Sequence, residues 1–164
     1  MTTVRSDLNL TGNLSDYMAE ARNRPLPPAV GREAKHRILD SLAAIVSGST
    51  LKPGQMALQY VRSLGGTPES MLMTTNDVSS AANAAMANGM LGHSDETDDF
   101  DPSSKAHPGC SVIPAAWAMA ERGSSTGTEL IRAVALGYDL ACRMLHAMHA
   151  DLVRPVSYTH LTLP

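Results

Sequence analysis

The sequence predicts an all-α fold of about six helices, and three observations support this prediction. Apolar residues make up 43% of the 164 residues, which is enough for one domain with a buried core. Aromatic residues make up only 4%, whereas alanine and methionine are abundant. This balance favours closely packed helices over β-sandwiches, which rely on aromatic and β-branched side chains. Apolar residues also recur at helical spacing in several segments.

The first two helices are separated by prolines. We expect a tail over residues 1–13 and a short helix over residues 14–24, capped by Asn13 or Ser15. Proline suits a first helical turn, so the next helix starts after the prolines and stops at Gly48. Apolar residues at every fourth position predict one buried stripe on it. This stripe comprises Val30, Ala34, Ile38, Leu42 and Val46.

Two further helices complete the first half. We expect the third over residues 54–64, ended by the pair Gly65-Gly66, and then a brief extended piece over residues 69–74. The fourth covers residues 79–92, with Asp77 or Ser79 as its cap. Its small, uncharged residues predict burial on most sides and a close approach by another backbone.

The second half contains a long polar segment and two helices. Residues 93–109 are expected to be irregular, and Pro114 marks the first turn of a helix that ends at Gly123. Thr126 and Glu129 fit a capping box at the start of the last helix. Asp139 and Arg143 form an i,i+4 pair on its surface. Its apolar stripe comprises Leu130, Val134, Tyr138, Ala141, Leu145 and Met148.

Composition and charge exclude several classes of protein. The net charge of −3 excludes a generally basic nucleic-acid binder, so no nucleic-acid partner is expected. Cys110 and Cys142 do not make a disulfide scaffold. The N-terminus lacks the apolar core of a signal peptide, and the charge-free middle segment is too short to span a bilayer. We therefore expect a cytoplasmic protein without a membrane partner. Residues 155–164 change character after Pro155 and are a candidate non-native tail.

The segment from His93 to His107 is the strongest candidate for chemistry. It reads HSDETDDFDPSSKAH, with five carboxylates in seven residues between two histidines and Lys105 before the second histidine. Crowded carboxylates repel one another, so we expect at least one raised carboxyl pKa. A raised carboxyl and a histidine are the usual parts of a general acid–base pair. The alternative is a solvated acidic loop, which the position between two apolar helices disfavours.

Metal binding by this segment is the next alternative. An EF-hand register from Asp95 fails, because Phe100 replaces the turn glycine and Ala106 replaces the bidentate glutamate. A transition-metal site formed by His93, Asp98 and His107 stays open, although the sequence has no HExxH or CxxC spacing. The leading prediction includes no metal and no cofactor.

The residues after the acidic segment suggest an anion site. The run from His107 to Ser111 leads into a helix, whose free N–H groups can hold a carboxylate or phosphate. Ordinary capping is the alternative reading of this helix start.

Three other features are weaker. A GxSxG match at residues 123–127 lacks the preceding strand that a nucleophile elbow needs. His146 and His149 could pair on a metal but fit an ordinary helix equally well. Cys110 has no fixed basic partner and is expected to be a small buried side chain rather than a nucleophile.

Several motifs follow one another in a defined order over residues 14–150. They are LPPAVGREAKHRILDSLAAIVSG, Gly65-Gly66, AANAAMANGMLGH, the acidic segment, HPGCSVIPAAWAMAE and GTELIRAVALGYDLACR. Together they resemble the N-terminal part of the MmgE/PrpD family, which includes 2-methylcitrate dehydratase, cis-aconitate decarboxylase and iminodisuccinate epimerase. The resemblance implies a longer protein, commonly a homodimer, with a large helical domain and a smaller α+β domain. Residues 14–154 would be part of the helical domain, with the α+β domain absent.

The resemblance also implies roles for single residues. Better-characterised members carry a loop close to H-x-x-D-F-D-D-T, followed by His-Pro. The positions that match are His93, Glu96, Asp98, Asp99 and His107-Pro108, whereas Phe100 departs from the family threonine. We therefore expect His107 to act as acid or base, with His93, Glu96, Asp98 and Asp99 as its catalytic partners. Lys105, Gly109 and Ser111 are expected to bind the carboxylate of the substrate.

Three hypotheses for function follow. The first is a fragment of a cofactor-independent lyase or isomerase that acts next to a carboxylate of a small carboxylic acid and is inactive alone. The second is a metal-dependent hydrolase that uses the His93–His107 segment, and the third is a non-catalytic helical module. The first raises a question of charge, because each close pair of like charges costs about 4 kcal/mol at an effective dielectric constant of 20. Either the loop carboxylates are paired or turned away, or the substrate carries little negative charge.

Overall fold

The computed structural model describes residues 9–103 and 105–147. Six helices and one two-stranded antiparallel sheet make up this part of the chain, which confirms the all-α prediction. The elements in order are α1 (Leu10–Ala21), α2 (Pro28–Gly48), α3 (Lys52–Leu64), β1 (Ser70–Met71), β2 (Val78–Ser79), α4 (Ala81–Gly92), α5 (Gly109–Arg122) and α6 (Gly127–Ala147). None of the described helices is long and apolar enough to cross a bilayer.

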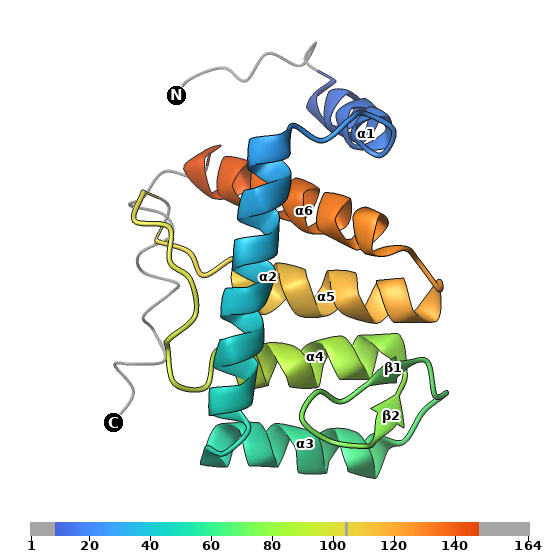
Figure 1. Ribbon diagram of the computed structural model, residues 1–164, viewed down its shortest axis with the longest axis vertical. Coiled ribbons are helices and arrows are strands. Elements are labelled where there is room, and N and C mark those ends of the chain that lie inside the picture. Colours follow the sequence, from blue (N-terminus) through green and yellow to red (C-terminus); the bar gives the residue numbers. More distant parts are fainter. Residues whose placement is uncertain (1–8, 104, 148–164) are drawn as a thin grey trace.

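The helices α3, α4, α5 and α6 lie side by side in chain order, and α2 runs across them (Figure 1). Each neighbouring pair in this layer is in contact, and α2 packs against α4, α5 and α6. The segment after α4 emerges beside α2 and returns to start α5. This segment is therefore held between two packed helices at one edge of the layer.

The core consists of two clusters. The larger joins α2, α3, the turn after β1 and α4 through Ile45, Leu58, Val61, Leu72, Met73, Ala84, Ala87 and Leu91. The smaller joins α2, α5 and α6 through Ala34, Ile113 and Val134. Since α2 contributes to both clusters, it ties the two ends of the helical layer together.

The buried face of α2 differs from the predicted stripe. Ala34 is buried as expected, but Val30 and Val46 are exposed, and Ile45 is buried instead. An α-helix turns about 100° per residue, so a strict four-residue spacing drifts by about 40° at each step. Over four steps the drift carries the ends of the stripe off the face that meets the core.

Four helix starts differ from prediction, and the smallest difference is in the third helix, which begins at Lys52 rather than at Gly54. The first helix begins at Leu10, where the side chain of Asn9 accepts the N–H of Gly12, rather than at an Asn13 or Ser15 cap. The fourth begins at Ala81 with a Ser80 cap, because residues 78–79 pair with β1 instead of entering the helix. The fifth begins at Gly109, so Pro114 lies inside it.

Two polar side chains, one buried and one partly buried, attach the hairpin to the helices. The amide of Asn88, which is fully buried, accepts the N–H of Met73 at 2.9 Å and donates to the carbonyl of Met71 at 3.0 Å. The carboxylate of Glu121 accepts the N–H of Met71 and the hydroxyl of Ser70. Backbone groups that would otherwise lack partners in the core are thereby satisfied.

Glycines on α2 and α4 allow the close approach that the sequence predicts. A side chain at Gly48 would overlap the carbonyl of Leu91, and a Cβ at Gly89 would lie 2.8 Å from the carbonyl oxygen of Cys110. These contacts bring the end of α4 against α2 and the start of α5 against α4, where the acidic segment begins and ends.

The last helix confirms two local predictions. Thr126 and Glu129 form a reciprocal capping box, and Arg143 pairs with Asp139 at 2.7 Å. Met148, His149 and the candidate tail over residues 155–164 lie outside the described residues.

Candidate functional site

The acidic segment joins the end of α4 to the start of α5 and faces α2 and α6. His93 is the residue that caps α4, and His107 lies two residues before α5. A single antiparallel bridge between Asp101 and Ala106 closes the middle of the segment into a tight turn. The two histidines, 14 positions apart in the sequence, are therefore brought together at one edge of the helical layer.

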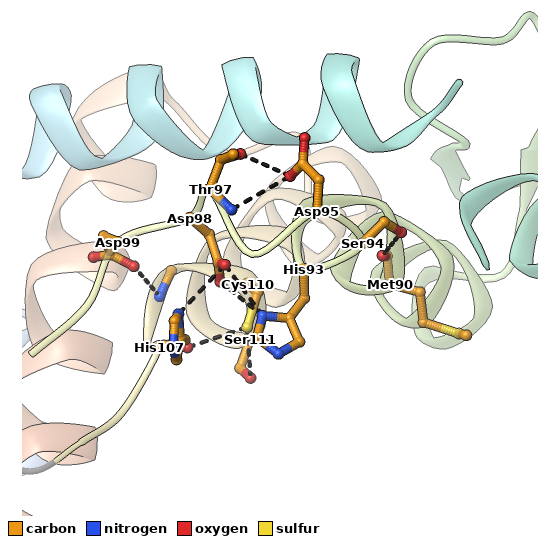
Figure 2. Close-up of polar contacts among 11 residues, drawn as sticks. Met90, His93, Ser94, Asp95, Thr97, Asp98, Asp99, His107, Cys110 and Ser111 are labelled. Atoms are coloured by element: carbon orange, nitrogen blue, oxygen red, sulfur yellow. Dashed lines mark hydrogen bonds and ion pairs between the residues drawn. The ribbon is translucent and has the colours of Figure 1, made fainter. Parts of the chain in front are cut away.

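Asp98 is the centre of the site. Its side chain is fully buried, and its Oδ1 lies 3.1 Å from Nδ1 of His93 and 3.3 Å from Nδ1 of His107. Figure 2 shows the carboxylate between the two rings. A buried carboxylate requires charged or hydrogen-bonding partners, and here two imidazoles supply them. The structure thus brings together three of the five predicted catalytic residues.

The two imidazoles are more accessible than the carboxylate that they flank. The side chain of His93 is 46% exposed and that of His107 is 29% exposed. Their ring centroids lie 5.0 Å apart in an edge-on arrangement. Because Nδ1 of each ring faces Asp98, Nε2 lies on the opposite side of the ring. A carboxylate that accepts the Nδ1–H leaves Nε2 as the basic nitrogen.

Asp99 has a different position from Asp98. Its Oδ1 accepts the N–H of Gly109 at 2.9 Å, and its Oδ2 accepts the hydroxyl of Tyr138 at 2.7 Å. Burial and the neighbouring Asp99 raise the pKa of Tyr138, so this hydroxyl stays protonated and donating. The N–H of Gly109, which we expected to hold a substrate carboxylate, is engaged by Asp99. The carboxylate at the start of α5 is the protein's own.

The other two aspartates of the segment also have partners. Asp95 accepts hydrogen bonds from the hydroxyls of Ser47 and Thr97, the latter at 2.7 Å. These bonds, the one from Ser47 first, lower the pKa of Asp95. Asp101 accepts the hydroxyl of Ser103 at 2.7 Å and lies 3.2 Å from Nε2 of His146. The four aspartates therefore occupy four separate settings.

This arrangement answers the question of charge that the sequence raises. Each aspartate is held by hydroxyl, imidazole or backbone donors, and none of the four is left to face a substrate without a partner. Glu96 is the fifth carboxylate of the segment and differs from the four aspartates. It is exposed and makes no hydrogen bond or ion pair with the described residues. Its backbone has a φ of 54°, which turns the chain ahead of Asp98.

The remaining predicted residues lie at the rim. Lys105 is exposed, and its Nζ lies 5.7 Å from the centre of the Phe100 ring. That ring lies 5.2 Å from the ring of His107, so Phe100 covers one side of the imidazole at the position where the family loop carries threonine. Ser111 is exposed on the first turn of α5, and its N–H donates to the carbonyl of Pro108.

Cys110 is a neighbour of the site that the sequence left as a packing residue. Burial, and then the charge of Asp98, raise the pKa of its thiol to about 11, so it is a protonated thiol at neutral pH. A ring nitrogen of His93, a carboxylate oxygen of Asp98 and Sγ of Cys110 lie within 4.8 Å of one another. Of the described residues, these three are the set that could hold a metal.

Sequence reasoning missed the two helices that support the segment. Ser47 on α2 and Tyr138 on α6 fix Asp95 and Asp99, but each pairing spans about 40 residues or more of sequence. The available signal was the hydroxyl of Tyr138 within an apolar stripe, because a buried tyrosine hydroxyl needs a polar partner. The GxSxG match at residues 123–127 directly follows α5, with no strand before it, as expected.

The model of the MmgE/PrpD N-terminal domain matches residues 12–163. The chain belongs to the MmgE/PrpD family. A curated relative, a cis-aconitate decarboxylase-like protein of Aspergillus oryzae, is 26% identical over 153 residues. The alignment covers 88% of this chain and 32% of that relative, so the chain spans about a third of the relative's length.

Proposed function

We propose that this MmgE/PrpD chain carries the acid–base part of a cofactor-independent lyase or isomerase site for a small carboxylic acid. One observation supports this proposal above the others: a fully buried Asp98 carboxylate lies between two imidazoles that are partly open to solvent. A merely structural carboxylate is satisfied equally well by backbone donors, as Asp99 is in part. Two histidines in that role supply imidazoles, which can take up and release protons.

The proposed chemistry uses the nitrogen of each ring that faces away from Asp98. Nε2 of His107 removes a proton from the carbon next to the substrate carboxylate and becomes an imidazolium, or, starting as an imidazolium, gives a proton to that carbon and becomes neutral. Asp98 stabilises that imidazolium and holds the ring in one orientation. His93, 5.0 Å away between ring centroids, is the second proton donor for a leaving hydroxyl or for the carbanion. Dehydration and epimerisation use both groups, whereas decarboxylation releases carbon dioxide and needs only the group that gives a proton to the carbanion.

The substrate class is a proposal that rests on family membership and on the relative. We propose a small di- or tricarboxylic acid, with cis-aconitate as the first compound to test. Lys105 is one cation at the rim, and the remainder of the full-length protein would supply the others. This chain alone is therefore expected to be inactive. A cytoplasmic homodimer is the assembly that we propose for the full-length protein.

The test is a panel of small carboxylic acids offered to the full-length protein in the presence of a metal chelator. The proposal predicts turnover of at least one acid, with or without chelator, and none by the 164-residue chain alone. If no acid of the panel is turned over by a folded full-length protein, the lyase proposal fails. Turnover by the chain alone at the rate of the full-length protein would contradict the expectation that it is inactive.

A metal-dependent hydrolase is the second candidate, and the proximity of Cys110 to His93 and Asp98 favours it. Such a site would activate a bound water rather than an imidazole. The chelator arm separates the two candidates, because a hydrolase of this kind loses its activity when the metal is removed.

A further inference from the structure

We propose that His93, Asp98 and Cys110 form a binding site for Zn²⁺ or a similar transition-metal cation. The three residues come from the end of α4, the acidic segment and the first turn of α5. One ligand atom from each lies within 4.8 Å of the other two. Ligand atoms around a tetrahedral zinc ion are about 3.3–3.8 Å apart, given bond lengths of about 2.0–2.3 Å, so shifts of about 1 Å close the site.

The kinds of donor atom favour zinc. Imidazole nitrogen, carboxylate oxygen and thiolate sulfur are the three protein donors that Zn²⁺ accepts, whereas Ca²⁺ and Mg²⁺ require oxygen ligands. Three protein ligands also leave one tetrahedral position for water or a ligand. The side chain of His93 is 46% exposed, so an ion can reach the cluster from solvent.

The charges also balance at this place. Binding replaces the S–H bond of Cys110 with a sulfur–metal bond and releases one proton to solvent. The Cys110 thiolate and the Asp98 carboxylate then carry two negative charges against the two positive charges of the ion. A neutral assembly lowers the cost of keeping the buried Asp98 carboxylate away from water.

A second observation points to a ligand at the same place. Nδ1 of His107 is buried and makes no well-aligned hydrogen bond with the described residues, although it lies 3.3 Å from Oδ1 of Asp98. A buried nitrogen without a good partner is costly in a finished core. Here it lies next to a proposed ligand oxygen, where a water or hydroxide bound to the ion would accept its N–H.

Metal and proton transfer would compete for the same atoms. Binding at the ion takes His93 and Asp98 out of the acid–base arrangement, so the cation is expected to inhibit the full-length lyase. This consequence rests on the proposed function, whereas the binding itself does not. Binding is therefore measured on the 164-residue chain, in which no turnover is needed.

The experiment is equilibrium dialysis of the metal-free chain against Zn²⁺, followed by metal analysis. Co²⁺ serves as the second probe, because a cobalt–thiolate bond produces a charge-transfer absorption. We expect one equivalent of metal, a thiolate absorption with Co²⁺, and release of one proton per ion bound. Cys110→Ala, His93→Ala and Asp98→Asn should each weaken Zn²⁺ binding at least about tenfold, as losing a direct ligand costs no less than losing its outer partner.

Matched variants control for other thiols and imidazoles. Cys142→Ala, His36→Ala and His146→Ala should leave the affinity for Zn²⁺ unchanged, since these residues lie on α2 and α6 outside the cluster. The absence of a cobalt–thiolate band in the unmodified chain would overturn the proposal without any variant having to fold. Equal weakening by Cys142→Ala and Cys110→Ala, or loss of binding in His146→Ala alone, would also overturn it.

Discussion

Asn88 and Asp98 are both buried polar residues near α4, but they are satisfied in different ways. Asn88 has no exposed surface. Its side-chain amide accepts one hydrogen bond from a backbone group next to β1 and donates another to a backbone group of β1. Asp98 is 5% exposed overall, and its carboxylate lies against two imidazoles that reach solvent. One residue is surrounded by backbone groups that never change charge, and the other by imidazoles, which can gain or lose a proton.

This difference distinguishes a residue that holds the fold from one that can carry chemistry. Removing a backbone-bonded amide leaves unsatisfied groups and weakens the fold. Removing an accessible imidazole changes the ability of the site to transfer a proton and lowers the free energy of unfolding by less. The predictions below would break the comparison if the two residues behaved alike.

The largest effect is expected from His107→Ala in the full-length protein. Loss of a general acid or base typically costs 10²- to 10⁴-fold, so kcat should fall by about 10²-fold or more. The matched control is His36→Ala, whose exposed ring pairs only with Glu33 on α2 among the described residues. An unchanged kcat in the His107 variant would remove this residue from the mechanism.

Asn88→Ala should give the largest loss of stability. The N–H of Met73 and the carbonyl of Met71 would both lose their side-chain partner inside the core. Leaving such groups unsatisfied costs about 1–3 kcal/mol in the free energy of unfolding, measured by denaturant titration. Asn83→Ala on the same helix is the control and should cost less, because its amide makes one long bond of 3.4 Å to Gly65. Equal losses in both variants would show that the Asn88 contacts do not hold the hairpin.

Tyr138→Phe should have a smaller effect that is confined to the start of α5. It removes the 2.7 Å hydrogen bond to Asp99, and bonds to charged groups contribute about 1.5–3 kcal/mol. Part of that loss is recovered, since Asp99 keeps the N–H of Gly109. Hydrogen exchange should rise at Gly109, whereas Tyr60→Phe on α3 should leave it unchanged. An unchanged hydrogen-exchange rate at Gly109 in the Tyr138 variant would show that Tyr138 does not support the start of α5.

The smallest effect is the pH response of Cys110. Its pKa of about 11 in the fold exceeds the value of about 8.5 for a free thiol. The raised pKa means that the stabilising effect of the protonated thiol is complete below about pH 8.5 and is lost as pH rises toward 11. Cys110→Ala should flatten this part of the curve of stability against pH, which is measured by thermal melting. A thiol that reacts rapidly with alkylating agents at pH 7 in the folded, metal-free chain would contradict the assignment.

Much of the fold could be predicted from the sequence because its signals are local. Periodicity located six helices, and a capping box at Thr126 and Glu129 marked the start of α6 correctly. The predicted start of α4 was wrong because Val78 pairs with Met71, seven residues earlier. Capping rules consider only neighbouring residues and do not include such pairing. The exposed ends of the α2 stripe were missed because a four-residue spacing is not the helical repeat.

The candidate site also has a part that the sequence predicts and a part that it does not. The cluster of histidines and carboxylates over residues 93–107 is visible in the sequence, but the role of each aspartate is not. Adjacent residues such as Asp98 and Asp99 look alike in sequence, yet one meets imidazoles and the other meets α6 and a helix N-terminus. Those partners are set by tertiary packing, so only the structure separates them.

The central claim is that Asp98, hydrogen-bonded to Nδ1 of His93 and 3.3 Å from Nδ1 of His107, orients both rings and leaves Nε2 of each ring free to take a proton. Long-range ¹H–¹⁵N NMR on the 164-residue chain identifies which ring nitrogen of each neutral histidine carries the proton. We expect Nδ1–H for His93 and His107, and a shift of the proton to Nε2 in both rings in Asp98→Asn, with His36 unchanged. If both rings carry Nε2–H in the unmodified chain, with the same spectrum in Asp98→Asn, the account is wrong.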